Sequence, residues 1–480
     1  MENAVTESNK ANNLLTRESK IITGIFFTVL TVSVYYWLVA VAYGSPASRF
    51  GALVNAALFA VLGIRFIPLW TESWNIAGRM ENRRAEQSID VTPSNETVIN
   101  KITLLKIFLA FLVFDFCIIL LIYILQLMSD NAAPFRESLE IWESIDSRHY
   151  LDIAKDWYFR AGDWNRLVQL VFLPGYPLMT RIVNILVGNV LYSGMIVSGL
   201  CFAGAGTIAY LLVRLDHSHR HALRVLKYLC ILPGAFFFAA PMSESMFLLL
   251  SVCCIYFLRK KEWFYACITG GAAAFTRSLG LVLFIPALYE MIADEAETMP
   301  SVSCHGRDKK LSWAAKYGNL IFIPFGFGSY LLINYQVSGN PFQFLIYQKE
   351  HWHQSISFFF NTTAYQIDYA MGCIQGQNYH DLLALWLPNL FCIFAGLIIM
   401  LIAVRKLRPS YTAYFMAYYV IAIGATWLLS GPRYLLTLFP IPMALAVIGK
   451  KPWLDTILTI GLSVFLGMYA YMFVNHWNVW

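Results

Sequence analysis

The sequence predicts an all-α protein that is embedded in a membrane and crosses it many times. Of its 480 residues, 58% are hydrophobic and only 13% are charged, and the mean hydropathy is +0.56. Soluble domains carry about 25% charged residues. Several apolar runs are also long enough to cross about 30 Å of hydrocarbon as helices. Together these observations exclude an ordinary soluble domain.

The apolar runs divide the chain into roughly 13 transmembrane or half-spanning helices by the usual length rule. In chain order, the expected helices cover residues 21–43, 51–70, 102–128, 190–213, 228–241, 245–258, 263–276, 279–291, 318–335, 382–404, 411–429, 434–449 and 453–473. Several of these runs are too short to cross alone. Broken helices persist in a membrane only where the freed backbone faces protein or a water-filled cavity. We therefore expect a wet cavity near the breaks at 241–245 and 276–280.

The N-terminal hundred residues differ from the rest of the chain. A polar segment, 1–20, precedes an apolar run that is too long for the core of a cleaved signal, so we predict an anchor helix. The first two apolar runs are followed by a polar linker at 71–100. We therefore predict a two-helix appendage with a cytoplasmic linker over 1–100 and the main transmembrane catalytic unit over 101–480.

The charges orient these helices. With the N-terminus in the cytoplasm, most Lys and Arg residues fall in the inner connections, as the positive-inside rule requires. This bias accounts for most of the net charge of +6, so no nucleic-acid partner is expected. The same orientation places outer loops at 129–189 and 336–381. It also places the polar breaks at 243–245, 276–278 and 430–434 on the outer side.

Cofactor and metal motifs are missing from the sequence. Nearly all of the nine cysteines fall in apolar stretches, which predicts neither a disulfide framework nor a Cys-x-x-Cys metal site. There is no GxxxxGK[ST] motif and no glycine-rich turn from strand to helix. We predict no cofactor and no metal site, and the sequence leaves open whether a divalent metal takes part.

Residues 144–158 form a polar segment that is acidic, basic and aromatic at once; it follows the apolar run 102–128 and leads within about 15 residues into the stretch FLPGYP at 172–177. Asp146, His149, Tyr150 and Ile153 have the spacing i, i+3, i+4, i+7, which places them on one face of a helix. A carboxylate at position 146 is suited to accept a proton from a substrate hydroxyl. The alternative is a structural pair on the helix face with Arg148 or His149.

Two arginines lie at breaks between apolar runs. An unpaired charge at membrane depth costs several kcal/mol, so Arg277 and Arg433 need partners. A phosphate fits the fork of donors on arginine, and the alternatives are an ion pair with a protein carboxylate or a snorkelling side chain. Glu244 is a candidate either for the ion pair with Arg277 or for binding a substrate hydroxyl.

The second outer loop carries an amide, an ammonium, an imidazole and an indole within residues 348–352. Gln348 is a candidate for substrate binding. Trp352 is either an anchor at the membrane interface or a platform on which a sugar stacks. A carboxylate base and buried arginines on one side of a membrane suit transfer from a lipid-linked phosphate donor to a hydroxyl.

These segments, in this order, resemble the PIG-V family, the second mannosyltransferases of GPI-anchor assembly and their bacterial relatives, within the GT-C class of membrane glycosyltransferases. The family pattern reads approximately WDSxHYLxIAxxGY, FFPLYP, YSES, TRSNG, a Gln-x-x-x-Trp loop and SxxRYxxxxFP. The resemblance covers about residues 101–450. The matching stretches here are DSRHYLDIA from Asp146 with Tyr158, FLPGYP from Phe172, Ser243-Glu244-Ser245, TRSLG from Thr276, Gln348 with Trp352, and SGPRY from Ser430 with Phe439-Pro440.

The resemblance implies a GT-C fold, a polyprenyl- or dolichyl-phosphate mannose donor and an inverting transfer. It implies that Asp146 is the general base and that Arg277 and Arg433 lie near the donor phosphate. It also implies amphipathic helices in the first outer loop. The chain departs from the family pattern at Ile145, where an aromatic residue is expected, and at Leu279, where an asparagine is expected.

The sequence thus predicts a hexosyltransferase that acts on a glycolipid or glycan acceptor at the outer or lumenal face, with mannose as the implied sugar. Glu244 and His149 are expected to help orient the sugar or the acceptor, and Tyr150 lies on the same helix face. A bacterial cell membrane is favoured, with the endoplasmic reticulum membrane as the eukaryotic alternative. A transporter or flippase for a lipid-linked or anionic solute, and a non-catalytic scaffold of a glycosylation complex, are the rival classes.

Overall fold

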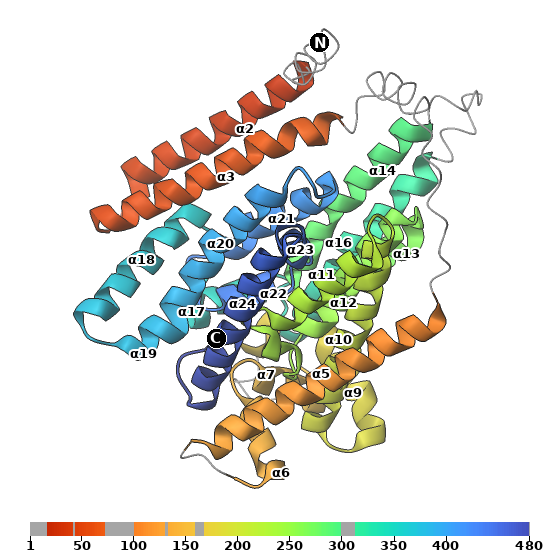
Figure 1. Cartoon of the computed structure of the whole chain (residues 1–480), viewed down its shortest axis with the longest axis vertical. Coiled ribbons are helices and arrows are strands. Elements are labelled where there is room, and N and C mark those ends of the chain that lie inside the picture. Colours follow the sequence, from red (N-terminus) through yellow and green to blue (C-terminus); the bar gives the residue numbers. More distant parts are fainter. Residues whose placement is uncertain are drawn as a thin grey trace.

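The computed structural model describes residues 17–41, 44–72, 100–129, 133–158, 168–298 and 313–479. These residues are almost entirely helical (Figure 1), and their one extended pairing is an isolated bridge between Ile356 and Ala425. Within the described residues, seven helical stretches are long and apolar enough to cross a membrane. The protein is therefore an all-α, multi-pass integral membrane protein, as the sequence predicts.

The long apolar stretches are built on seven helices. They are α2 (Arg17–Tyr36), α3 (Pro46–Glu72), α5 (Lys101–Leu127), α10 (Val190–Arg214), α16 (Phe322–Ser338), α20 (Leu387–Ala403) and α24 (Pro452–Val474). Shorter helices fill the interior between them: α11 (His219–Ile231), α12 (Glu244–Arg259), α13 (Trp263–Thr276), α14 (Phe284–Thr298), α18 (Phe359–Gln375), α21 (Pro409–Ile423), α22 (Gly431–Leu436) and α23 (Pro440–Ile448).

Short helices lie in the regions 129–189 and 336–381. They are α6 (Phe135–Ser138), α7 (Ser147–Asp156), α9 (Gly175–Val187), α17 (Gln343–Trp352) and α19 (Tyr379–Asp381). Two of them are amphipathic, as the resemblance implies: α7 buries Tyr150, Leu151 and Ile153, whereas α9 exposes Ile185 and Leu186 on its outward side.

The helices pack in a connected bundle. α10, α12, α13 and α16 follow one another as neighbours, and α5 crosses α10 on the outside (Figure 1). At the other flank, α3 packs against α18 and α20, and α2 lies along α3. Buried polar contacts join α3 to its neighbours, because Asn55 donates to Thr363 on α18 and accepts from the Tyr419 hydroxyl on α21.

Several predicted helices match the structure closely, including 102–128, 190–213, 263–276 and 453–473. The apolar run 228–241 does not form one helix. α11 ends at Ile231, Pro233 and Gly234 follow, and residues Ala235–Phe238 form a single 3-10 turn. Proline lacks the backbone donor that would continue the helix, which explains this break.

Two further runs also differ from the predicted helices. The helix expected over 411–429 ends at Ile423, and the helix expected over 434–449 is divided between α22 and α23. The outer region 336–381 contains α17 and α18, which hydropathy did not predict. α18 carries polar residues such as Thr362, Thr363 and Gln366, yet all three are fully buried.

Candidate active site

A polar cavity of about 380 Å³ lies where several helix ends meet. Its walls come from α7, the link between α13 and the next turn, α17, the segment 424–430 and α22. The lining residues include Asp146, Tyr150, Phe172, Arg277, Ser278, Leu279, Gln348, His351, Trp352, His353, Gln354, Trp427, Ser430 and Arg433. Polar residues that are far apart in the sequence therefore share one chamber.

The helix termini bring these residues together. α12 begins at Glu244, α13 ends at Thr276 directly before Arg277, and α22 begins at Gly431 two residues before Arg433. Asn389 on α20 accepts the Gly431 backbone N–H at 2.8 Å, which fixes the start of α22. Gly280 allows the turn after Arg277 to pack on α13, because a Cβ atom there would lie 2.3 Å from the Ala274 nitrogen.

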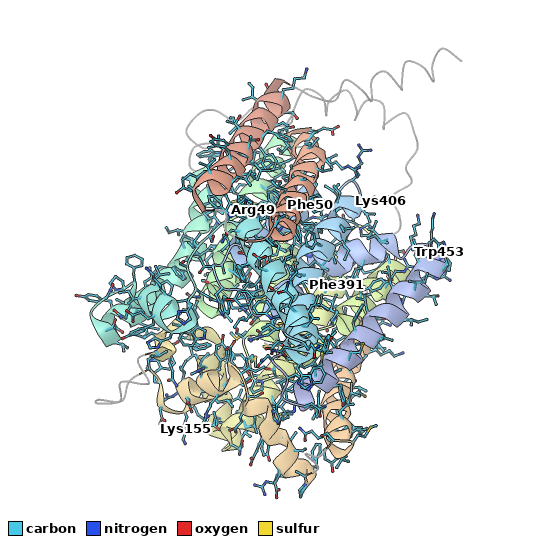
Figure 2. The ribbon with its side chains drawn as sticks, turned by 90° about the vertical axis from the view of Figure 1, so that its left-hand side faces the viewer. Arg49, Phe50, Lys155, Phe391, Lys406 and Trp453 are labelled. Carbon is cyan, nitrogen blue, oxygen red and sulfur yellow. The ribbon has the colours of Figure 1, made fainter. Side chains whose placement is uncertain are left out.

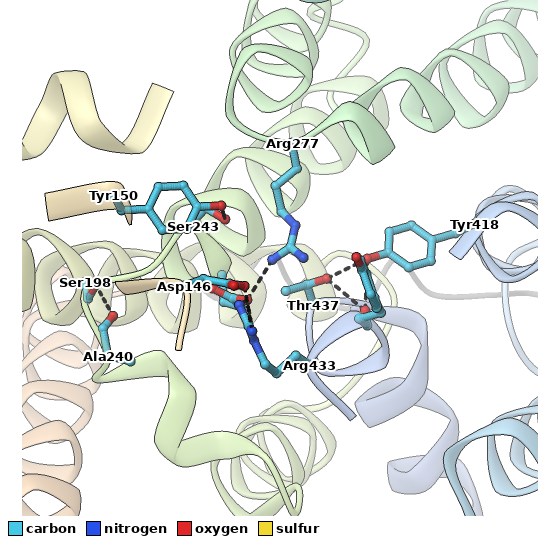
Figure 3. A network of polar contacts seen from close by, with 11 residues as sticks. Asp146, Tyr150, Ser198, Ala240, Ser243, Arg277, Tyr418, Arg433 and Thr437 are labelled. Atoms are coloured by element: carbon cyan, nitrogen blue, oxygen red, sulfur yellow. Dashed lines mark hydrogen bonds and ion pairs between the residues drawn. The ribbon is translucent and has the colours of Figure 1, made fainter. Parts of the chain in front are cut away.

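Glu244 is the centre of a polar network to which Asp146, Arg277 and Arg433 belong; these three are labelled in Figure 3. Its side chain is fully buried, and its Oε1 accepts from Arg433 Nε at 3.0 Å and Nη2 at 2.7 Å. Arg277 Nη1 lies 2.9 Å from the same oxygen as an ion pair. A buried carboxylate is stabilised only when such partners offset its lost hydration. Of the two roles considered for Glu244, the contacts are those of the ion pair with Arg277.

Arg433 also reaches the candidate base. Its Nη1 lies 2.8 Å from Asp146 Oδ2, so one guanidinium joins Asp146 to Glu244 (Figure 3). The Arg433 side chain is only 3% exposed, whereas that of Asp146 is 29% exposed towards the cavity. Asp146 precedes α7, and the strained backbone of Ile145, at φ 58°, turns the chain into this helix.

Hydroxyl groups hold the walls around this network. The Tyr150 hydroxyl lies 2.9 Å from Ser243 Oγ, which fixes α7 against the start of α12. On the opposite side, the Tyr418 hydroxyl donates to the Tyr434 carbonyl at 2.9 Å and lies 3.0 Å from Thr437 Oγ1. These contacts hold α7 and α22 in position and thereby set the distance between Asp146 and the arginines.

His149 does not line the cavity. Its ring stacks on Phe172 with centroids 4.7 Å apart, and Trp352 packs edge-on at 6.2 Å. Burial lowers the pKa of His149 below its ordinary value, against the opposing effect of Asp146 and Asp152. The aromatic surroundings therefore favour the neutral form of the imidazole.

Gln348 and Trp352 occupy the far wall of the cavity on α17. Gln348 Nε2 donates to Gln354 Oε1 at 2.8 Å, and Gln354 Nε2 donates to the Trp427 carbonyl at 2.7 Å. The Gln348 side-chain oxygen, Oε1, takes no part in this amide chain, whereas the Gln348 backbone carbonyl accepts the Gln354 backbone N–H at 3.1 Å. Residues 355–357 also pair with 424–426 through backbone hydrogen bonds, which closes that wall.

Most of the residues selected from the sequence therefore meet in one place. Asp146, Tyr150, Arg277, Gln348, Trp352 and Arg433 line the cavity, with Glu244 directly behind the arginines and His149 behind Phe172. Sequence reasoning missed Gln354, His353 and Trp427. No local pattern marks these three, because their positions follow from the pairing of two irregular segments. Among the described residues, no group of three or more His, Cys, Asp or Glu side chains is arranged to hold a metal ion.

An apolar cavity of about 540 Å³ lies on the other side of α22. It is lined by side chains of α20 and α24, among them Phe391, Phe465 and Met472. Pro432 lines this apolar cavity, and the next residue, Arg433, lines the polar one. The two spaces are therefore separated by a single turn of α22.

Comparison with known proteins gave one structural likeness. No family model matches the sequence, and no curated protein matches it. The crystal structure of ArnT from Cupriavidus metallidurans bound to undecaprenyl phosphate is similar to this chain with a TM-score of 0.42 and 13% sequence identity. The match covers 76% of this chain and 75% of that chain. The site is therefore interpreted from the residues of this chain.

Proposed function

We propose that this protein is a membrane glycosyltransferase that transfers a hexose from a polyprenyl- or dolichyl-phosphate donor to an acceptor hydroxyl. The observation that carries the proposal is one cavity with a partly exposed carboxylate, Asp146, beside two buried arginines. Such a cavity offers a base for a hydroxyl and donors for a phosphate at the same place.

In this mechanism Asp146 accepts the proton of the acceptor hydroxyl. The acceptor oxygen forms a bond with the anomeric carbon while the bond between that carbon and the phosphate oxygen breaks. The lipid phosphate leaves with the electron pair of that bond, and Arg277 and Arg433 stabilise the charge that grows on it. Attack from the face opposite the phosphate inverts the anomeric centre. Gln348 and Trp352 lie across the cavity, where they are suited to bind and stack a sugar.

The apolar cavity beside Pro432 supports a donor that is a lipid. A polyprenyl chain needs an apolar path that ends at its phosphate, and the space between α20 and α24 ends one residue from Arg433. A donor that already resides in the bilayer also explains a chemistry that needs no nucleotide motif.

The finer assignments rest on the resemblance to the PIG-V family. They are mannose as the sugar, a glycolipid or glycan acceptor, and a bacterial cell membrane with the reaction on its outer face. Leu279 lines the cavity at the position where the family pattern has asparagine, so sugar selection is expected to depend on this residue. Residues 101–480 would form the catalytic unit, and the helices within 1–100 would form its appendage.

The test is product analysis with membranes that contain the overexpressed protein. Membranes are supplied with polyprenyl-phosphate mannose, glucose or arabinose, each labelled in the sugar, and both lipid and glycan products are separated. A labelled product that depends on the protein, with mannose as the best donor, is expected. Uptake of the labelled lipid or sugar into proteoliposomes with no covalent product would instead identify a transporter.

A further inference from the structure

The arrangement around Arg433 bears on how the proposed reaction is controlled. Arg433 divides its donors between two carboxylates: Nε and Nη2 contact Glu244, and Nη1 contacts Asp146. The three contacts lie between 2.7 and 3.0 Å, so each of the three guanidinium nitrogens contacts a carboxylate oxygen. The candidate base and the candidate phosphate ligand are therefore bound to one another.

The two carboxylates differ in their access to the cavity. Glu244 is completely buried and does not line the cavity, whereas Asp146 lines it and is 29% exposed. An anion in the cavity can therefore reach the Asp146 side of Arg433 and cannot reach the Glu244 side. Glu244 would hold the Arg433 guanidinium in place by accepting from Nε and Nη2, while Nη1 exchanges Asp146 for the anion.

The charges of the network are balanced before any substrate enters. Two arginines, Arg277 and Arg433, face two carboxylates, Asp146 and Glu244. A phosphodiester donor brings a third anion to the same two cations. The partly exposed pair is the weaker one, because solvent screens it and its acid can be rehydrated in the cavity.

We propose that the donor phosphate displaces Asp146 from Arg433 Nη1, so that the base becomes free only when the donor is bound. Arg433 is then a positioning residue for Asp146 as well as a phosphate ligand, and Glu244 is its anchor. While this ion pair is formed, Oδ2 of Asp146 lies against the guanidinium and is not placed on an acceptor hydroxyl. This coupling rests on the proposed function and predicts that the donor binds before the acceptor.

The test measures the affinity of the full-length protein for undecaprenyl phosphate in nanodiscs. If Asp146 and phosphate compete for Arg433, Asp146→Asn should bind the lipid phosphate roughly fivefold more tightly, as expected from loss of a partly exposed ion pair. The matched control is Asp152→Asn, which removes the same charge from α7, the helix that directly follows Asp146, at a residue that accepts from Gln169. This control should change the affinity by less than about twofold.

Three results would overturn the coupling: unchanged affinity in Asp146→Asn, weaker affinity, or equal tightening in Asp152→Asn. Asp146→Ser serves as a second neutral variant if the first is poorly folded in a melting experiment on the same sample. Transfer assays separate this inference from the proposed function. If Asp146→Asn loses transfer but binds the lipid phosphate as the wild type does, Asp146 remains the candidate base, and the proposed displacement from Arg433 is wrong. If Asp146→Asn binds the lipid phosphate more tightly and retains full transfer, Asp146 and phosphate do compete for Arg433, but Asp146 is not the general base.

Discussion

Glu244 shows at the scale of single residues why this site is both stable and polar. A charge buried alone in a protein costs several kcal/mol, and Arg277, Arg433 and Glu244 offset that cost by sharing one carboxylate oxygen. The second oxygen, Oε2, has no hydrogen-bond partner within the described part of the chain. The hydrogen bonds of the Glu244 carboxylate are therefore incomplete at this second oxygen.

Removal of Glu244 should destabilise the protein strongly. Glu244→Ala leaves two buried cations without their shared anion, for which we expect a loss of about 3–5 kcal/mol. Thermal unfolding in detergent should show a melting temperature well below that of the wild type. The control is Glu140→Ala, at an exposed position of the outer loop, which should change stability by less than about 0.5 kcal/mol. Equal melting temperatures for both variants would contradict the burial of this charge.

The buried imidazole of His149 should make stability depend on pH. Burial lowers the pKa of His149 in the folded protein, whereas the unfolded chain keeps the ordinary value of about 6.5. The unfolded state therefore binds the proton more readily, and stability falls as the pH drops below about 6.5. His149→Phe keeps a ring against Phe172 and removes this titration.

The melting temperature of the wild type should consequently fall more than that of His149→Phe when the pH is lowered from about 7.5 to about 5. Other histidines titrate in both proteins, so the difference between the two curves isolates position 149. Parallel curves would show that the imidazole is not held neutral by its surroundings.

The sequence could predict the charged residues of the site for a simple reason. Arg277 and Arg433 stand out because charges are rare in apolar segments, and Asp146 stands out through its helix face. The sequence could not choose between substrate and ion pair for Glu244, because a pairing across 189 positions leaves no local pattern. Gln354 was missed for the same reason, since its role depends on the Trp427 carbonyl.

At the scale of elements, the contact between α13 and α16 depends on glycine. A Cβ atom at Gly326 would lie 1.9 Å from the Gly271 carbonyl oxygen, so the two backbones touch. Gly328, on the same helix, has open space around its own Cβ position. Close backbone approach between small residues is a common way to pack helices in membranes.

Gly326→Ala should therefore push α16 away from α13 and cost about 1–3 kcal/mol. Gly328→Ala should be neutral or stabilising by up to about 1 kcal/mol, because alanine favours helix more than glycine does. Thermal unfolding of the two variants in the same detergent gives the comparison. A larger loss in Gly328→Ala than in Gly326→Ala would contradict this packing.

Helices were predictable where one apolar run forms one element, as in α5, α10, α13 and α24. Prediction failed where a run is broken inside the protein. Hydropathy reports only transfer into an apolar environment, and it does not register the 3-10 turn at Ala235–Phe238 or the break between α22 and α23. α18 was missed because its hydroxyl and amide groups lower its hydropathy. In the structure these groups are buried and donate to backbone carbonyls of the segment 424–430.

At the scale of the whole molecule, the positive-inside rule predicts which end of the bundle faces the cytoplasm. Lys155, on α7, lies near one end, and Lys406, after α20, lies in the opposite half of the molecule (Figure 2). The positive-inside rule places Lys406 in the cytoplasm and Lys155 outside. The candidate site lies next to α7, so this predicted orientation would place it on the outer face.

Cysteine labelling in intact cells tests the orientation. A membrane-impermeant maleimide should label Lys155→Cys in intact cells and should label Lys406→Cys only after the cells are opened. The wild-type protein gives the background from its native cysteines. The reverse pattern would place the candidate site in the cytoplasm and contradict a reaction on the outer face.

The most direct test of the central claim is transfer by Asp146→Asn in purified membranes with labelled polyprenyl-phosphate mannose. Asparagine keeps the size of the side chain and cannot serve as the base, so the transfer rate should fall by about 10²- to 10⁴-fold. The variant must be expressed and folded as well as the wild type, and Asp152→Asn should retain transfer. Full transfer by a well-folded Asp146→Asn variant would contradict the claim that this carboxylate is the general base of a glycosyltransferase.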